Sequence, residues 1–372
     1  MARKRPLRSS GTVVVLEHTS RILAGNPLGD PHVRKLAVWL PAQYDEGAGA
    51  GRGRRFPVLY DLVGFTGSGL SHVGWKPFGD NVPDRVARLV HARRMGPTIM
   101  VFPDCFTSLG GNQYVNSTAI GSYADYLTRE IIPFVDREFR TLAAREHRGC
   151  FGKSSGGYGA IIHGMKHAQH WGAIANHSGD AYFDFVYCHD WPNTLNELAK
   201  YREPKRKEGS SAVLRDAAAR PGLADGFDDG RVKRFLDAVW RREKLSHPEV
   251  HAIMNVCMAA TYDPDPAAPL GFRLPYHLDT GERLEARWRN WRRHDPIHLV
   301  GKYKDNLASL RGIYIDCGWR DQYHIHYGTR ILSQRLAEAG IRHTYEEYDD
   351  NHSDVDYRMD VSLPFLYQAL KP

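Results

Sequence analysis

The chain has 372 residues, 42% of them hydrophobic and 25% charged, so it can bury a full core as one large domain or two small ones. The only apolar run near its basic first residues is Val13 to Leu16, too short for a signal peptide or a membrane span, so we expect a cytoplasmic protein without a membrane anchor. Five scattered cysteines lack the paired spacing of a zinc site, and the net charge of +7 is spread along the chain, so we expect no metal and no nucleic-acid partner.

Short apolar, β-branched runs recur along the chain and predict strands. There are eight of them, at residues 11–18, 34–41, 56–64, 98–104, 147–152, 172–179, 312–318 and 343–350. Helix-period segments lie between several of them, at 122–139, 156–168 and 326–340. This alternation predicts an α/β fold with a mostly parallel eight-stranded sheet covered on both faces, and the first two strands, which no helix separates, form an antiparallel edge.

The gap between the sixth and seventh predicted strands is far longer than one crossover needs. We therefore expect one domain over residues 1–372, with a partly helical cap inserted at 181–310. Residues 230–245 have a helical pattern, and Trp288 and Trp291 are spaced for one buried helix face with arginines on the solvent side. The Gly-rich stretch 45–55 reads as a flexible loop.

The stretch "CFGKSSGGYGA", residues 150–160, fits two motifs. A phosphate-binding loop needs a glycine five residues before Gly152, but His147 stands there, so that interpretation fails. The G-x-S-x-G turn is matched by Gly152, Ser154 and Gly156, which follow a strand and precede a helix. That context predicts Ser154 as a catalytic nucleophile. Its side chain would lie in a strained turn, where the small residues Gly152 and Gly156 avoid steric clashes.

A nucleophilic serine needs a histidine base that a carboxylate orients, and in this type of fold the chain order is serine, acid, histidine. His352 follows the last predicted strand, so its loop would bring it toward Ser154. After the seventh strand, Asp321 lies in the loop and is favoured as the acid over Asp316, which lies in or at the end of the strand. The other carboxylates considered for this role are Asp354 and Asp180.

Acyl transfer also needs two donors for the oxyanion. The backbone N–H groups of Ser155 and Phe65 are the candidates, one directly after the nucleophile and one in the loop after the third strand. Four aromatic residues near these positions are candidates for the pocket wall or for core packing: Trp75, Tyr158, Trp319 and Tyr323. Lys153, beside the nucleophile, either favours an anionic substrate or points outward.

With these pieces in place, the sequence resembles the "putative esterase" (esterase D-like) family of α/β-hydrolases, whose relatives include S-formylglutathione hydrolases, feruloyl and acetylxylan esterases, enterochelin esterases and mycolyltransferases. The resemblance is carried by stretches such as "FPVLYDLVGF", "GKSSGGYGAIIHGMKH", "YIDCGWRDQY" and "NHSD". It implies a triad of Ser154, Asp321 and His352, with Phe65 and Ser155 supplying the oxyanion amides. It also implies a small-molecule ester substrate, no cofactor and a homodimer.

These expectations combine into a serine esterase that forms an acyl-enzyme. An acyltransferase would use the same acyl-enzyme and differ only in the acceptor, so the sequence leaves it open. A non-catalytic binding protein on a hydrolase scaffold is the remaining alternative, disfavoured because all three triad residue types occur in the expected order.

Overall fold

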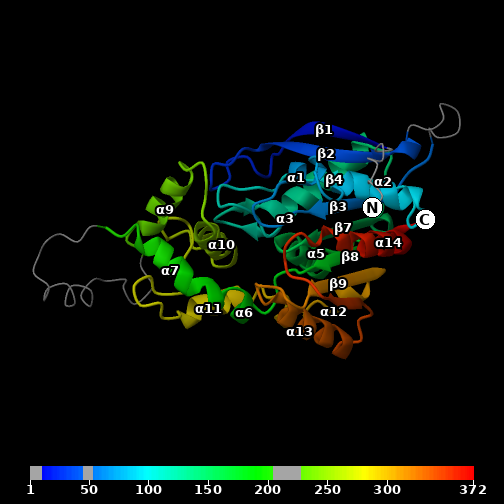
Figure 1. Cartoon of the computed structure of the whole chain (residues 1–372). Coiled ribbons are helices and arrows are strands. Elements are labelled where there is room, and N and C mark those ends of the chain that lie inside the picture. Colours follow the sequence, from blue (N-terminus) through cyan, green and yellow to red (C-terminus); the bar gives the residue numbers. More distant parts are fainter. Residues whose placement is uncertain (1–10, 45–52, 204–227) are drawn as a thin grey trace, which may run out of the picture.

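A single large sheet organises the chain, of which the computed structural model describes residues 11–44, 53–203 and 228–372. Figure 1 shows this sheet, whose strands have the spatial order β1-β2-β4-β3-β7-β8-β9-β10. All eight predicted runs form its strands, with the bounds β1 (Gly11–Thr19), β2 (Val33–Pro41), β3 (Val58–Leu62), β4 (Ile99–Phe102), β7 (Arg148–Lys153), β8 (Ala173–His177), β9 (Gly312–Gly318) and β10 (Thr344–Tyr348). Most of the predicted Gly-rich loop at 45–55 lies outside the described residues.

The strand directions confirm the predicted sheet. The pairs β4·β3, β3·β7, β7·β8, β8·β9 and β9·β10 are parallel. The edge pair β1·β2 is antiparallel, and β2 also runs antiparallel to β4. A small hairpin of β5 (Asn116–Ser117) and β6 (Gly121–Ser122) was not predicted, because strands of two residues are too short to show an alternating pattern.

Apolar side chains are buried on both faces of the sheet. Successive side chains of a strand point to opposite faces, so neighbouring residues belong to different buried clusters. In β3, Tyr60 belongs to one buried cluster and its neighbour Leu59 to the other. In β7, Cys150 and Phe151 divide in the same way. The main helices around the sheet are α1 (Gly69–Val73), α2 (Val82–His91), α3 (Tyr123–Asp125), α4 (Ile132–Glu138), α5 (Ser155–Lys166), α13 (Ile325–Glu338) and α14 (Met359–Leu370).

The helices divide between the two faces as the clusters do. Apolar residues of α2 and α14 pack in the cluster of Leu59 and Phe151, whereas α4, α5 and α13 contribute to the other cluster. The segment predicted as one helix at 122–139 is α3, a π-helical stretch (Tyr126–Ile131) and α4. Pro133, which has no N–H to donate into a helical ladder, lies in the first turn of α4, two residues after the end of that irregular stretch.

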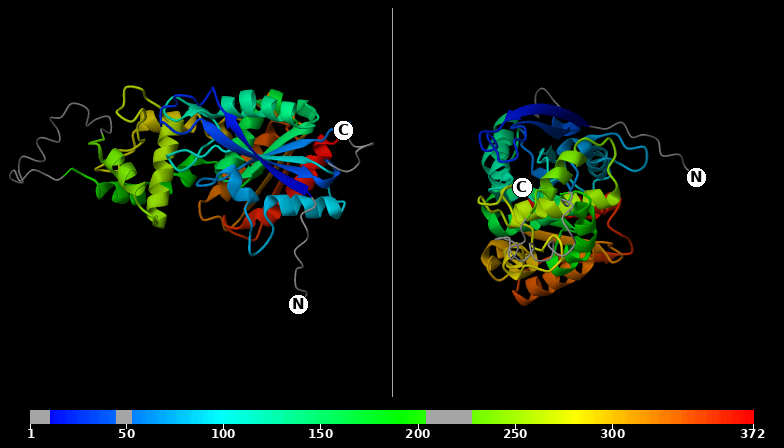
Figure 2. Two further views of the ribbon diagram at one scale, coloured as in Figure 1. Left: turned by 90° about the horizontal axis from the view of Figure 1, so that it is seen from above. Right: turned by 90° about the vertical axis from the view of Figure 1, so that its left-hand side faces the viewer.

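The described part of the long segment between β8 and β9 contains several helices. Its helices are α6 (Phe183–Val186), α7 (Trp191–Ala199), α9 (Arg231–Val239), α10 (His247–Tyr262), α11 (Glu285–Arg292) and α12 (Lys304–Ala308). Figures 1 and 2 show that α7, α9, α10 and α11 gather at one end of the sheet, and α12 packs against α5. Trp288 and Trp291 of α11 are both buried, as their spacing predicts.

The core of this insertion joins the core of the sheet. Val256 of α10 and Trp291 belong to the same buried cluster as Ile161 of α5. The division into a single domain with a cap at 181–310 stays a prediction.

Candidate active site

Ser154 stands at the junction of β7 and α5, in a backbone conformation that L residues rarely adopt. Its φ is 58° and its ψ is −123°. The turn is held on both sides: the Ser154 N–H donates to the carbonyl of His177 at 3.0 Å, and the Ser154 carbonyl accepts from the Tyr158 N–H at 2.8 Å. Strained backbone of this kind persists where surrounding contacts enforce it and concentrates at functional sites.

The two glycines around Ser154 are required by close packing of the turn against β3. A Cβ on Gly156 would lie 1.6 Å from the carbonyl oxygen of Leu62, and one on Gly152 would lie 2.1 Å from the same oxygen. Backbone cannot move aside as a flexible side chain can. The G-x-S-x-G spacing therefore reflects the approach of β3 to the turn as well as the turn itself.

We expect Gly156→Ala to destabilise the protein by about 3 kcal/mol or more, because the added methyl overlaps a backbone carbonyl and forces β3 away from the turn. Chemical denaturation of the variant beside the wild type measures this difference. Gly301→Ala is a matched control, since a Cβ there meets nothing within 4 Å. Equal stability of Gly156→Ala and the wild type would contradict the packing argument.

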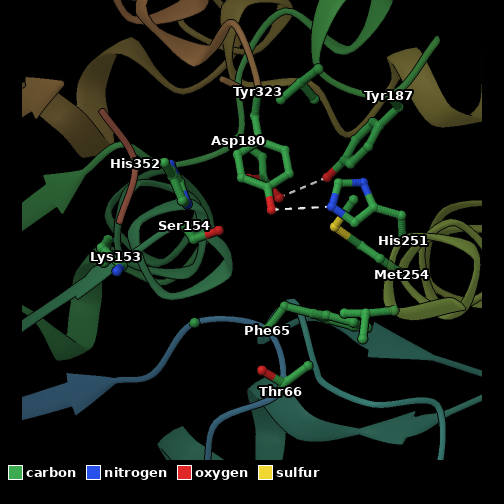
Figure 3. A pocket seen from close by; sticks show the side chains of 13 residues that line it. Phe65, Thr66, Lys153, Ser154, Asp180, Tyr187, His251, Met254, Tyr323 and His352 are labelled. Atoms are coloured by element: carbon green, nitrogen blue, oxygen red, sulfur yellow. Dashed lines mark hydrogen bonds between the residues drawn. The ribbon is translucent and has the colours of Figure 1, made fainter. Parts of the chain in front are cut away.

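His352 and Asp321 meet at the ends of two neighbouring strands, β10 and β9. The Nδ1 of His352 lies 2.7 Å from Oδ2 of Asp321, and both side chains are buried. The second oxygen of Asp321 accepts the Tyr323 N–H at 2.9 Å, and the His352 N–H donates to Oε1 of Gln322 at 3.0 Å. In Figure 3 the imidazole of His352 lies beside the Ser154 side chain. The three residue types of a catalytic triad are thus brought to one edge of the sheet.

Asp316, the other candidate acid, belongs to a different network inside the fold. Its carboxylate contacts Nδ1 of His177 at 2.7 Å, Nε of Arg358 at 2.9 Å and the hydroxyl of Tyr314 at 3.0 Å. Burial by itself would raise the pKa of Asp316, but the charges and hydrogen bonds of His177 and Arg358 hold it below its ordinary value. This carboxylate ties β9 to β8 and to the chain before α14.

The two remaining carboxylates have other surroundings. Asp354 is exposed and has a left-handed backbone, φ 54°. Asp180 lines the pocket described below, where it accepts from the hydroxyl of Tyr187 at 2.8 Å and from Nε2 of Gln113 at 3.1 Å. Burial raises the pKa of Asp180.

The two proposed oxyanion donors lie on adjoining segments. A Cβ on Gly64 would lie 3.2 Å from the Lys153 carbonyl and 3.5 Å from Cβ of Ser154, so the loop after β3 passes directly beside Ser154. Phe65 follows in that loop, and Ser155 begins α5, where helical N–H groups are free and the helix dipole favours negative charge. Within the described residues, neither amide donates to a backbone carbonyl.

A pocket of about 170 Å³ opens at Ser154 and His352 (Figure 3). The sequence-predicted residues Phe65, Lys153 and Tyr323 line it as well. The other lining residues come from the loop after β3, from the turn after β8 and from α6 and α10 of the insertion: Gly64, Thr66, Asp180, Val186, Tyr187, Val250, His251 and Met254. Sequence reasoning missed the wall from α6 and α10, because no motif marks which helix faces of an insertion turn toward the sheet.

Of the four candidate aromatics, only Tyr323 lines this pocket. Tyr158 is fully buried and donates its hydroxyl to the carbonyl of His294 at 3.0 Å, a core position. Trp75 and Trp319 are 83% and 48% exposed and are not among the lining residues.

Comparison with known proteins agrees with this architecture. The model of the family described as "Putative esterase" matches residues 31–362. The chain belongs to this family. The match covers the sheet from β2 to β10, including Ser154, Asp321 and His352, so the esterase-family resemblance seen in the sequence is confirmed.

Two curated relatives of this esterase-family chain come from Mycobacterium tuberculosis, Esterase MT1326 of strain CDC 1551 / Oshkosh and Esterase Rv1288 of strain ATCC 25618 / H37Rv. Each is 28% identical over an alignment of 152 residues, and the match covers 38% of this chain. The matched part spans 29% of the length of each relative.

Solved structures share the fold over nearly the whole chain. A ferulic acid esterase superposes with a TM-score of 0.56 at 17% identity, covering 97% of this chain and 99% of the other. An S-formylglutathione hydrolase from Agrobacterium tumefaciens gives a TM-score of 0.53 at 15% identity, covering 98% and 97%. These identities establish the fold alone, and the α/β-hydrolase fold predicted from the sequence is confirmed.

Two further observations concern membranes and metals. Among the described helices, none is both long and apolar enough to cross a membrane. Over residues 11–44, 53–203 and 228–372, no three His, Cys, Asp or Glu side chains surround a common point where an ion could be held. The cytoplasmic location and the homodimer stay predictions.

Proposed function

We propose that this protein is a serine carboxylic ester hydrolase that works through an acyl-enzyme. The observation that carries the proposal is the buried His352–Asp321 pair beside Ser154, with the serine held in a strained strand-to-helix turn. Membership of the esterase family supports the same reaction class.

In the proposed mechanism, Ser154 attacks the acyl carbon while Nε2 of His352 takes the hydroxyl proton. Asp321 accepts the Nδ1–H of His352, which fixes the tautomer and stabilises the imidazolium as it forms. The N–H groups of Phe65 and Ser155 would then stabilise the oxyanion. His352 returns the proton to the leaving alcohol, and a water activated by the same imidazole releases the acid and restores Ser154.

The test is hydrolysis of p-nitrophenyl esters from acetate to octanoate by the wild type and by variants of the three triad residues. Activity that depends on Ser154 and His352 supports the proposal. A wild type that hydrolyses none of these esters contradicts it and favours a binding role for the scaffold.

We expect short acyl chains to be preferred. The pocket volume of about 170 Å³ is below the roughly 300–1,000 Å³ of sites that enclose drug-sized ligands, and Val186, Val250 and Met254 close one side of it. The kcat/KM for acetate or butyrate should therefore exceed that for octanoate by about tenfold or more. Met254→Ala, which enlarges the pocket, should shift the preference toward longer chains. A wild type that prefers octanoate would contradict this reading of the pocket.

A further inference from the structure

Two histidines on the insertion face each other at the wall of the pocket. His247 and His251 are four residues apart on α10, so their side chains lie on one face of the helix. Their Nε2 atoms are 3.1 Å apart, and their ring centroids are 4.1 Å apart. His247 is exposed at the start of the helix, whereas His251 is largely buried and lines the pocket.

A carboxylate outside the helix orients the second of these imidazoles. Asp190, at the end of the short 3₁₀ helix η5 (Cys188–Asp190), hydrogen-bonds Nδ1 of His251. Both side chains are largely buried, and the contact places an Asp190 oxygen as the acceptor for the Nδ1–H of His251. The Nε2 of His251 is thereby left to face His247, which is the arrangement of a carboxylate–histidine–metal relay.

The separation of the two nitrogens is close to what one shared ion requires. Two ligand nitrogens bound tetrahedrally to Zn²⁺ at about 2.0–2.1 Å lie roughly 3.3–3.4 Å apart. The hydroxyl of Tyr323 lies 3.4 Å from Nε2 of His251, on the pocket side, as the dashed line in Figure 3 shows. An oxygen is therefore within reach of the same point.

We propose that His247 and His251 bind a divalent transition-metal ion, with Zn²⁺ as the reference case, through their Nε2 atoms. Asp190 supports the site through Nδ1 of His251, and water completes the coordination beside Tyr323. Since no third His, Cys, Asp or Glu of the described residues joins the pair, the affinity is expected to be weaker than that of a closed structural zinc site. The imidazole nitrogens suit Zn²⁺, Cu²⁺ or Ni²⁺ and disfavour Mg²⁺ or Ca²⁺.

The test is a calorimetric titration of the full-length protein, free of any polyhistidine tag, with Zn²⁺. We expect one site in the wild type and at least a tenfold loss of affinity in His247→Ala, whose side chain is exposed and whose removal should not disturb folding. Asp190→Asn should weaken binding by about tenfold to a hundredfold, as outer-sphere partners do. His298→Ala, an exposed histidine elsewhere in the insertion, is the matched control.

The proposal is overturned if the wild type binds no Zn²⁺, since a proton shared between the two imidazoles then explains their closeness. It is also overturned if His247→Ala binds as tightly as the wild type, since the ion is then held elsewhere. Thermal unfolding of each variant confirms that the folded state is compared. Because Zn²⁺ binding is measured directly, this result does not depend on whether the protein hydrolyses esters.

The position of the metal site predicts an effect of Zn²⁺ on esterase activity, and this prediction rests on the proposed hydrolase function. An ion at His251 narrows the pocket that contains Ser154, so saturating Zn²⁺ should lower esterase activity severalfold in the wild type, and His247→Ala should need at least tenfold more Zn²⁺ for the same inhibition. Full activity of a zinc-saturated wild type would contradict the placement of the ion against the pocket.

Discussion

Ser154→Ala is expected to lower kcat for ester hydrolysis by on the order of 10⁵- to 10⁶-fold, because no other group can form the acyl-enzyme. The fold should survive, since the Ser154 side chain forms no capping hydrogen bond with α5 in the described structure and the turn is held by backbone contacts to His177 and Tyr158. Activity against p-nitrophenyl acetate, together with covalent labelling by a fluorophosphonate probe, measures the loss.

Ser309→Ala is a suitable control, because Ser309 is exposed and does not line the pocket. It should keep both activity and labelling. If Ser154→Ala retained more than a few per cent of the wild-type rate, another nucleophile would have to carry the reaction and the acyl-enzyme at Ser154 would be excluded.

Removing the charge of the two aspartates near the end of β9 is expected to have different effects. The substitution of Asp321 should lower the rate of catalysis, whereas that of Asp316 should lower stability. Asp321→Asn should lower kcat by about 10⁴-fold with little loss of stability, because an amide at this position favours the wrong tautomer of His352. Asp316→Asn should cost about 3 kcal/mol of unfolding free energy, because Arg358 and His177 lose the carboxylate that both contact in a buried site.

Comparing the two variants separates an effect on catalysis from an effect on stability, because the same Asp→Asn substitution is made at two positions that are five residues apart. Both rate constants and unfolding free energies are measured for each variant. If Asp316→Asn reduced kcat as strongly as Asp321→Asn while leaving stability unchanged, the assignment of the catalytic acid would be reversed.

The sequence by itself determined the framework of the sheet and marked Ser154 as the candidate nucleophile. The six inner strands β2, β4, β3, β7, β8 and β9 consist mostly of buried residues, so local composition marks them, whereas the edge strands β1 and β10 are only partly buried or exposed. Ser154 was recognisable because close packing requires glycine at positions 152 and 156. All of these positions lie within five residues of the chain, so a short sequence motif describes them. His352 could be chosen among 19 histidines only through its position after the last strand.

Only the tertiary structure shows which side chains contact each other near Ser154 and which residues line its pocket. The sequence favoured Asp321 over Asp316 only by its place in the loop after the strand. The structure adds their surroundings: Arg358 and His177 contact Asp316, and His352 contacts Asp321. The pocket wall from α6 and α10 comes from the insertion, outside the segments that carry Ser154, Asp321 and His352. His251 and Asp190, which meet beside it, are 61 positions apart in the chain. Such contacts depend on how helices pack over the sheet, a long-range property that no local pattern of residues encodes.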